Sequence, residues 1–210
     1  EKSSFSLESV KDEKLTLTLG DHSSTNERAM LQCVFGFMTY LDQCFPESEA
    51  KVIATEDTPS NSPDNASIDS SESSPDSVTR FVQRLNHHKL ARAISFVVAL
   101  VYLERLCRQG DSLDRQKLKN FFLAALMTGS KFLDDRCPKN KSWAAAGSVA
   151  IADLNALEVD FLSSLSFAAF VSDREVSSML DDLADFSRCS SPSQRACTAM
   201  ARRFNPARPS

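Results

Sequence analysis

The side chains that could ligate a metal or attack a substrate are scattered along this chain. Six cysteines occur among 210 residues, and none forms a Cys-x-x-Cys pair or a Cys/His group with zinc-ligand spacing. His87 and His88 are adjacent, so they do not share one side of a helix. Asp153, Glu158 and Asp160 lie close together, but no histidine accompanies them. We therefore expect no metal site and no catalytic residue.

Motifs that bind nucleotides or support hydrolysis are also missing. The sequence contains no Gly-x-Gly-x-x-Gly, no Walker A motif, no Gly-x-Ser-x-Gly and no His-Glu-x-x-His. Only five glycines are available for a loop that would cradle a phosphate. These absences predict a protein that is not an enzyme and that uses no cofactor and no small-molecule ligand.

Three Ser/Thr-Pro pairs point to a different chemistry, the acceptance of phosphate from a proline-directed kinase. Thr58, Ser62 and Ser74 each precede a proline within residues 46–75, a segment rich in Ser and in acidic residues. Because this segment has few large apolar side chains, it cannot bury enough surface to offset its ordering entropy, and we expect a disordered linker. Ser and Pro also coincide by chance in such linkers, so both interpretations of the pairs stay open.

Charge is divided unevenly along the chain. The net charge is −4, with 6 Lys and Arg against 15 Asp and Glu in residues 1–80, and 18 against 13 in residues 81–210. The basic excess is spread rather than concentrated in one helix, so we expect no nucleic-acid partner. No run of 18 apolar residues occurs, and we expect no membrane-spanning helix.

Apolar residues recur with helical spacing in most of the remaining chain. Met30, Val34 and Phe37 indicate a helix that Asn26 caps. A later helix, around residues 88–109, is apolar on most of its sides, which is typical of the central helix of a bundle. The predicted all-α chain has a flexible N-terminal tail, an N-terminal helix, an acidic linker, a five-helix domain and a flexible C-terminal tail, at residues 1–25, 26–45, 46–75, 76–187 and 188–210.

Four segments within the five-helix domain follow one another in a specific order. They read Tyr102-Leu-Glu-Arg-Leu106, Gly129-Ser-Lys-Phe-Leu-Asp-Asp135, Asn140-Lys-Ser-Trp143 and Leu154-Asn-Ala-Leu-Glu-Val-Asp-Phe-Leu162. Together with the preceding Arg84-Leu85 pair, they resemble the cyclin box, and in particular the P/U-type cyclins related to the yeast phosphate-signalling cyclin. The resemblance covers residues 75–175, about half of the chain.

This resemblance implies a single five-helix cyclin box that activates a cyclin-dependent Ser/Thr protein kinase, in the cytoplasm and/or the nucleus. In that family, a Lys at the end of the third helix and a Glu on the fourth hydrogen-bond the backbone beside the kinase's regulatory helix. Lys131 and Glu158 hold the matching positions. We expect Phe132 and Leu162 to take part in the same contact, which involves the ends of helices three to five of the box.

The family also pairs an Arg of the first box helix with an acid of the second. By position these are Arg84 and Glu104, where Glu104 departs from the usual Asp. A second departure is Ala146-Gly147-Ser148, where the family often has Val-Gly-Gly. The alternative function is a cyclin-fold adaptor that binds other proteins without activating a kinase, although an adaptor has no reason to keep the Lys131 and Glu158 pair.

Overall fold

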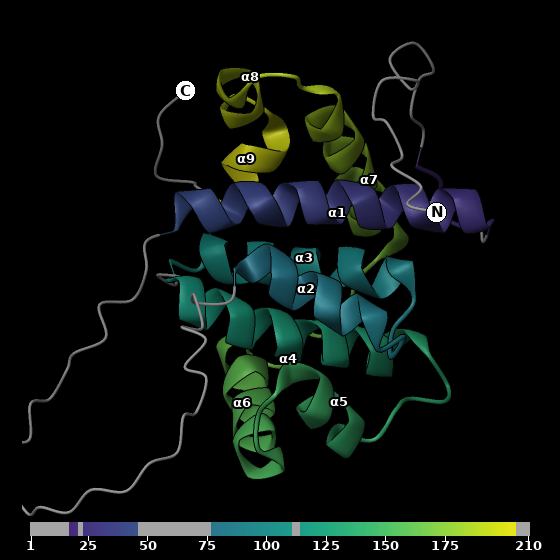
Figure 1. The fold of residues 1–210 in the computed structure, drawn as a ribbon, viewed down its shortest axis with the longest axis vertical. Coiled ribbons are helices and arrows are strands. Elements are labelled where there is room, and N and C mark those ends of the chain that lie inside the picture. The colour runs from purple at the N-terminus through teal and green to yellow at the C-terminus, as the bar shows by residue number, and fades with distance from the viewer. Residues whose placement is uncertain (1–16, 21–22, 46–76, 111–113, 205–210) are drawn as a thin grey trace, which may run out of the picture.

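The computed structural model describes residues 17–20, 23–45, 77–110 and 114–204, whose regular structure is entirely helical (Figure 1). Nine helices form in this part of the chain: α1 (Ser24–Cys44), α2 (Val78–His87), α3 (Ala93–Arg108), α4 (Arg115–Leu133), α5 (Asn140–Gly147), α6 (Ile151–Ser164), α7 (Asp173–Arg188), α8 (Pro192–Ala196) and α9 (Ala199–Arg203). The predicted all-α fold is confirmed.

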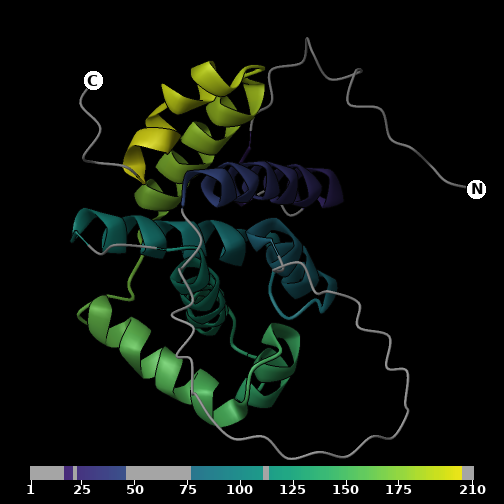
Figure 2. The same ribbon diagram turned by 60° about the vertical axis from the view of Figure 1, so that its left-hand side comes forward.

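Helix α3 forms the centre of the fold. Thirteen of its 16 residues are buried, and it lies between α1 and α7 on one side and α4 on the other (Figure 2). The predicted central helix is therefore present, but it begins at Ala93 rather than near residue 88. Lys89 has a φ of 53°, so the backbone turns between α2 and α3 instead of continuing as a helix.

Helix α1 starts earlier than its sequence suggested. The Ser23 side chain caps it by accepting a hydrogen bond from the Asn26 backbone N–H at 3.2 Å. Asn26, which we expected to be the cap, instead donates from its side-chain amide to the Thr18 carbonyl at 2.9 Å. This bond and the burial of Leu17 hold residues 17–20 of the predicted N-terminal tail against the helical body.

The predicted flexible C-terminal tail contains two packed helices. The side chains of Ser191 and Thr198 cap α8 and α9. Met200 and Phe204 are buried, and the Phe204 ring lies 5.0 Å from that of Phe37 on α1. Each helix has five residues, which is too few for a helical repeat to be visible in the sequence. The prediction of a flexible tail is therefore wrong for residues 192–204.

Helix α5 follows Pro138 and lies between α4 and α6 in the sequence. Its Trp143 side chain is fully buried. The backbone at Gly147 lies so close to α4 that an added Cβ would be 2.5 Å from Leu123 Cδ2. A Cβ here would force the Leu123 side chain to shift, so glycine lets α5 pack closely against α4.

Candidate functional site

Lys131 lies in the last turn of α4, the helix that packs along α3. The Asp114 side chain caps the start of α4 by accepting a hydrogen bond from the Lys117 N–H at 2.7 Å. Near the other end, Ser130 is fully buried, whereas its neighbours Lys131 and Phe132 are exposed. The helical register of α4 therefore turns these two side chains toward solvent together.

Glu158 lies on α6 and reaches Lys131 on α4. Buried Leu154 and Phe161 pack α6 onto the core, and Glu158 lies one helical turn after Leu154. The Lys131 Nζ and Glu158 Oε1 atoms are 2.5 Å apart, in side chains that are 34% and 17% exposed. The two residues that the resemblance matched to the family's Lys and Glu therefore contact each other. Leu162, one turn further along α6, is half-buried.

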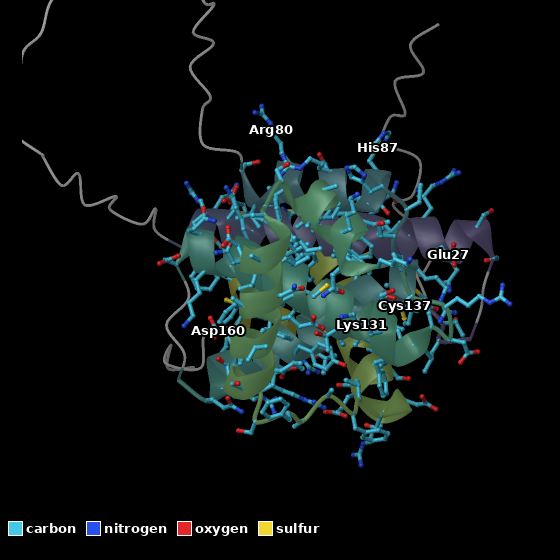
Figure 3. All side chains as sticks on the ribbon, turned by 90° about the horizontal axis from the view of Figure 1, so that it is seen from below. Glu27, Arg80, His87, Lys131, Cys137 and Asp160 are labelled. Carbon is cyan, nitrogen blue, oxygen red and sulfur yellow. The ribbon has the colours of Figure 1, made fainter. Side chains whose placement is uncertain are left out.

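The second oxygen of the Glu158 carboxylate has a partner that the sequence did not reveal. Asn140, the first residue of α5, donates from Nδ2 to Glu158 Oε2 at 3.1 Å and to Asn155 Oδ1 at 2.9 Å. The carboxylate is thus fixed from α4 and from α5. Because an ammonium has three N–H donors, Lys131 retains donors that can bind another molecule. Figure 3 views the molecule from this side, with Lys131 near the middle of the face.

Large exposed apolar side chains occur near Lys131 and Glu158 in the sequence. Among the described residues there are five, and all lie between the end of α4 and the start of α7. Phe132 and Phe170 are 41% and 72% exposed, and their rings meet edge to face at 6.2 Å. The others are Ile151, Val159 and Phe167. Of the five, Phe132 and Phe170 are in contact, and an exposed aromatic pair of this kind is typical of a protein-binding surface.

An open cleft of about 520 Å³ borders the ring pair. Phe132 and Phe170 line it from one side, and Ile94, Val98 and Val176 line it from α3 and α7. The lining is mainly apolar, so the cleft suits an apolar side chain of a partner rather than a charged ligand.

Arg84 and Glu104 do not pair, and the prediction of an ion pair between them is wrong. Helix α2 packs against α1, α4 and α5, so Arg84 faces α5. There its Nε donates to the Ala146 carbonyl at 3.3 Å, and its guanidinium lies 5.3 Å from the centre of the Phe81 ring.

Glu104 takes its main cation from α9. The Glu104 side chain is 6% exposed, and its two oxygens lie 3.1 and 3.0 Å from Arg203 Nη1. Arg108 also reaches it at 2.6 Å, and Arg203 in turn contacts Asp182 and Ser178 on α7. Burial alone would lower the pKa of Arg203, but the two carboxylates more than offset this and raise it. This cluster holds α9 against α3 and α7.

Three further expectations concern phosphorylation, metal binding and membrane-spanning helices. Thr58, Ser62 and Ser74 lie outside the described residues. Where the structure describes the chain, no three His, Cys, Asp or Glu side chains form a group that could hold a metal. Within the same residues, every helix is too short or too polar to cross a membrane.

Comparison with known proteins identifies the family of this chain. The Cyclin family model matches residues 32–169, which is more than half of the chain. This match begins inside α1, whereas the sequence segments placed the resemblance after residue 74. The N-terminal helix is therefore part of the region that matches the family.

Individual relatives give the same result. The chain is 37% identical over 101 residues to Cyclin-P2-1 and 31% identical over 93 residues to Cyclin-P4-1, both from Oryza sativa subsp. japonica. It is 29% identical over 96 residues to Cyclin-U2-1 from Arabidopsis thaliana. The matches cover 46%, 43% and 45% of this chain and 45%, 44% and 43% of the relatives, so the chain spans less than half the length of each. The chain belongs to the cyclin family, among its P- and U-type members.

Proposed function

We propose that this chain is the regulatory subunit of a cyclin-dependent Ser/Thr protein kinase and catalyses no reaction itself. The observation that carries this proposal is the Lys131–Glu158 pair, which joins the end of α4 to α6. The five exposed apolar side chains between α4 and α7 support it, since they leave a surface that a second protein can cover.

The pair has the chemistry that backbone recognition requires. The Lys131 ammonium donates hydrogen bonds, and the Glu158 carboxylate accepts them. The backbone carbonyls and amides at the end of a partner's helix offer the complementary groups, because those groups lack partners inside the helix. Hydrogen bonds from charged groups are stronger than neutral ones, so two such contacts give the docking both affinity and a fixed orientation.

Apolar contacts complete the proposed interface. Phe132 and Leu162 flank the pair on α4 and α6, and Phe167 and Phe170 follow on the next loop. When a partner covers these side chains, water is excluded from the polar contacts, which strengthens them. The cleft beside Phe132 and Phe170 receives an apolar side chain of the kinase.

The kinase is activated because the cyclin holds the kinase's regulatory helix in one position. Docking pushes the kinase's regulatory helix inward, so that its Glu pairs with the Lys that binds ATP. The cyclin supplies no catalytic group and acts by shifting the kinase population toward this active arrangement. We place the complex in the cytoplasm and/or the nucleus, in cell division and the cell cycle or in phosphate signalling. The proposed partners include no nucleic acid, no membrane and no small molecule.

Affinity capture from cell extract tests the function and the site together. The full chain is compared with the double variant Lys131→Ala/Glu158→Ala, and co-purified proteins and kinase activity are measured. The matched control is Lys141→Ala/Asp160→Ala, which removes the same charges from exposed positions on α5 and α6. We expect the wild type and the control to retain a cyclin-dependent kinase that the site variant loses.

The other outcomes are equally informative. A kinase retained by all three proteins would keep the function and refute the site. A folded wild type that captures a different protein and no kinase would contradict the proposal in favour of the non-activating adaptor.

The linker adds a regulatory proposal. Thr58, Ser62 and Ser74 are phosphorylated by the bound kinase, because each precedes a proline in the acidic segment. Mass spectrometry after incubation of the active complex with ATP is expected to find phosphate on these residues. If an active complex leaves all three unmodified, this regulatory proposal is wrong.

A further inference from the structure

The loop between α6 and α7 (residues 165–172, the aromatic loop) begins with an unusual turn. Ser166 and Phe167 have φ values of 52° and 57°, a region that residues with a Cβ rarely adopt. The Phe167 N–H donates to the Leu162 carbonyl at 2.8 Å, and the Ser166 N–H donates to the Ser163 carbonyl at 2.9 Å. These two bonds cap the end of α6 and fix where the aromatic loop starts.

Two side chains of α3 hold the middle of the aromatic loop. The buried Tyr102 hydroxyl donates to the Ala169 carbonyl at 2.7 Å. Arg105, one helical turn later, donates from Nη1 to the Ala168 carbonyl at 2.6 Å and from Nη2 to the Phe170 carbonyl at 2.9 Å. Three successive carbonyls are therefore fixed from one face of α3, by a planar guanidinium and a hydroxyl.

The far end of the aromatic loop is tied to the same guanidinium. Arg105 Nη2 lies 2.7 Å from Glu175 Oε1, and Glu175 Oε2 accepts hydrogen bonds from the backbone N–H and the hydroxyl of Ser172. Burial raises the pKa of Tyr102 to about 12, so its hydroxyl keeps its proton and remains a donor. The anchoring thus extends from α6 to the N-terminus of α7.

Two largely exposed aromatic residues, Phe167 and Phe170, belong to this anchored part of the loop. Phe167 and Phe170 are 68% and 72% exposed. We propose that Tyr102 and Arg105 are positioning residues for partner binding, which hold the aromatic loop so that Phe167 and Phe170 are presented to the kinase beside Lys131. This inference rests on the proposed function. A loop that is already ordered loses less entropy on binding, which increases affinity.

Hydrogen exchange in the free chain tests the anchoring without any partner. The amides of residues 166–169 are hydrogen-bonded, so their exchange rates report how firmly the loop is held. We expect faster exchange at these amides in Tyr102→Phe and in Arg105→Lys, since an ammonium cannot span the same acceptors. The matched control, Arg108→Lys on the same helix, leaves these rates unchanged. Equal rates in all four proteins would overturn the anchoring.

Affinity for the captured kinase tests the positioning role. We expect Tyr102→Phe and Arg105→Lys each to weaken binding roughly tenfold while circular dichroism shows a folded chain. The double variant Phe167→Ala/Phe170→Ala is expected to weaken binding at least as much. Adding Arg105→Lys to that double variant produces no further loss, because the positioning residue acts through the two rings.

Four results would overturn the inference. Fully additive losses would mean that Arg105 acts independently of the rings. A lower melting temperature with unchanged affinity would mean that Tyr102 and Arg105 are merely structural. If Lys131→Ala/Glu158→Ala loses the kinase but the ring variant keeps it, the proposed function stands and this inference is wrong. If the wild type captures no kinase, both fail.

Discussion

Two ion pairs in this protein differ in burial, and that difference assigns them different roles. The Lys131–Glu158 pair has side chains that are 34% and 17% exposed, whereas Glu104 is 6% exposed and meets both Arg203 and Arg108. Exposed pairs contribute about 0–1 kcal/mol to stability because water screens them. A buried charge that loses its partner costs about 3–5 kcal/mol.

Glu104→Ala is therefore expected to destabilise the protein more than Lys131→Ala. Removal of Glu104 leaves the Arg203 guanidinium, which is 17% exposed, with one carboxylate instead of two. The expected loss for Glu104→Ala is about 2 kcal/mol, because Arg203 loses charge-assisted hydrogen bonds but keeps Asp182, against less than about 1 kcal/mol for Lys131→Ala. Thermal unfolding followed by circular dichroism measures both. Equal shifts in melting temperature would contradict the structural role of Glu104.

At the scale of single elements, the end of α5 explains a departure from the family pattern. Ser148 has a φ of 56°, and its N–H and that of Val149 donate to the Ala145 and Ala144 carbonyls. Glycine is the residue that usually adopts this left-handed conformation at a helix end. Ser148 stands where P/U-type cyclins often have a second glycine. The serine therefore imposes strain that glycine would not.

Ser148→Gly is expected to stabilise the chain by about 1 kcal/mol, because glycine adopts a positive φ without steric cost. The matched control is Ser142→Gly, in the helical part of the same element, which is expected to destabilise by about 1 kcal/mol. Urea unfolding measures both changes. Destabilisation by both substitutions would show that the Ser148 side chain contributes more than the strain costs.

At the scale of the whole molecule, one carboxylate couples folding to pH. The hydrogen bonds from Arg105 and from the Ser172 backbone lower the pKa of Glu175 to about 2. The ordinary value is 4.5, so the folded state binds this proton less readily than the unfolded chain does. The resulting stabilisation is present above about pH 4.5 and is lost as the pH falls toward 2.

Glu175→Gln is expected to reduce the loss of stability between pH 5 and pH 2. The effect is modest, because the Glu175 side chain is 42% exposed and water screens its interaction with Arg105. Unfolding in urea at several pH values gives the comparison. If the variant and the wild type lose stability in parallel over this range, Glu175 is not the group that titrates.

The sequence determined the elements whose patterns are long and local. Helical spacing of apolar residues predicted α1, the central helix α3 and the helical domain around it. The proximity of Lys131 and Glu158 was also predictable, since each occupies a fixed place in a motif that resembles a known family.

The tertiary structure decided which distant groups meet. Arg203 replaces Arg84 as the partner of Glu104, because α9 folds back onto α3 and α7 while α2 faces α5. Asn140 contacts Glu158, which is 18 positions away, and Arg105 holds carbonyls of the aromatic loop that are 63 and 65 positions away. Local spacing carries no information about such pairs. Such pairs depend on how the buried surfaces of distant helices pack against each other, which is a property of the complete fold.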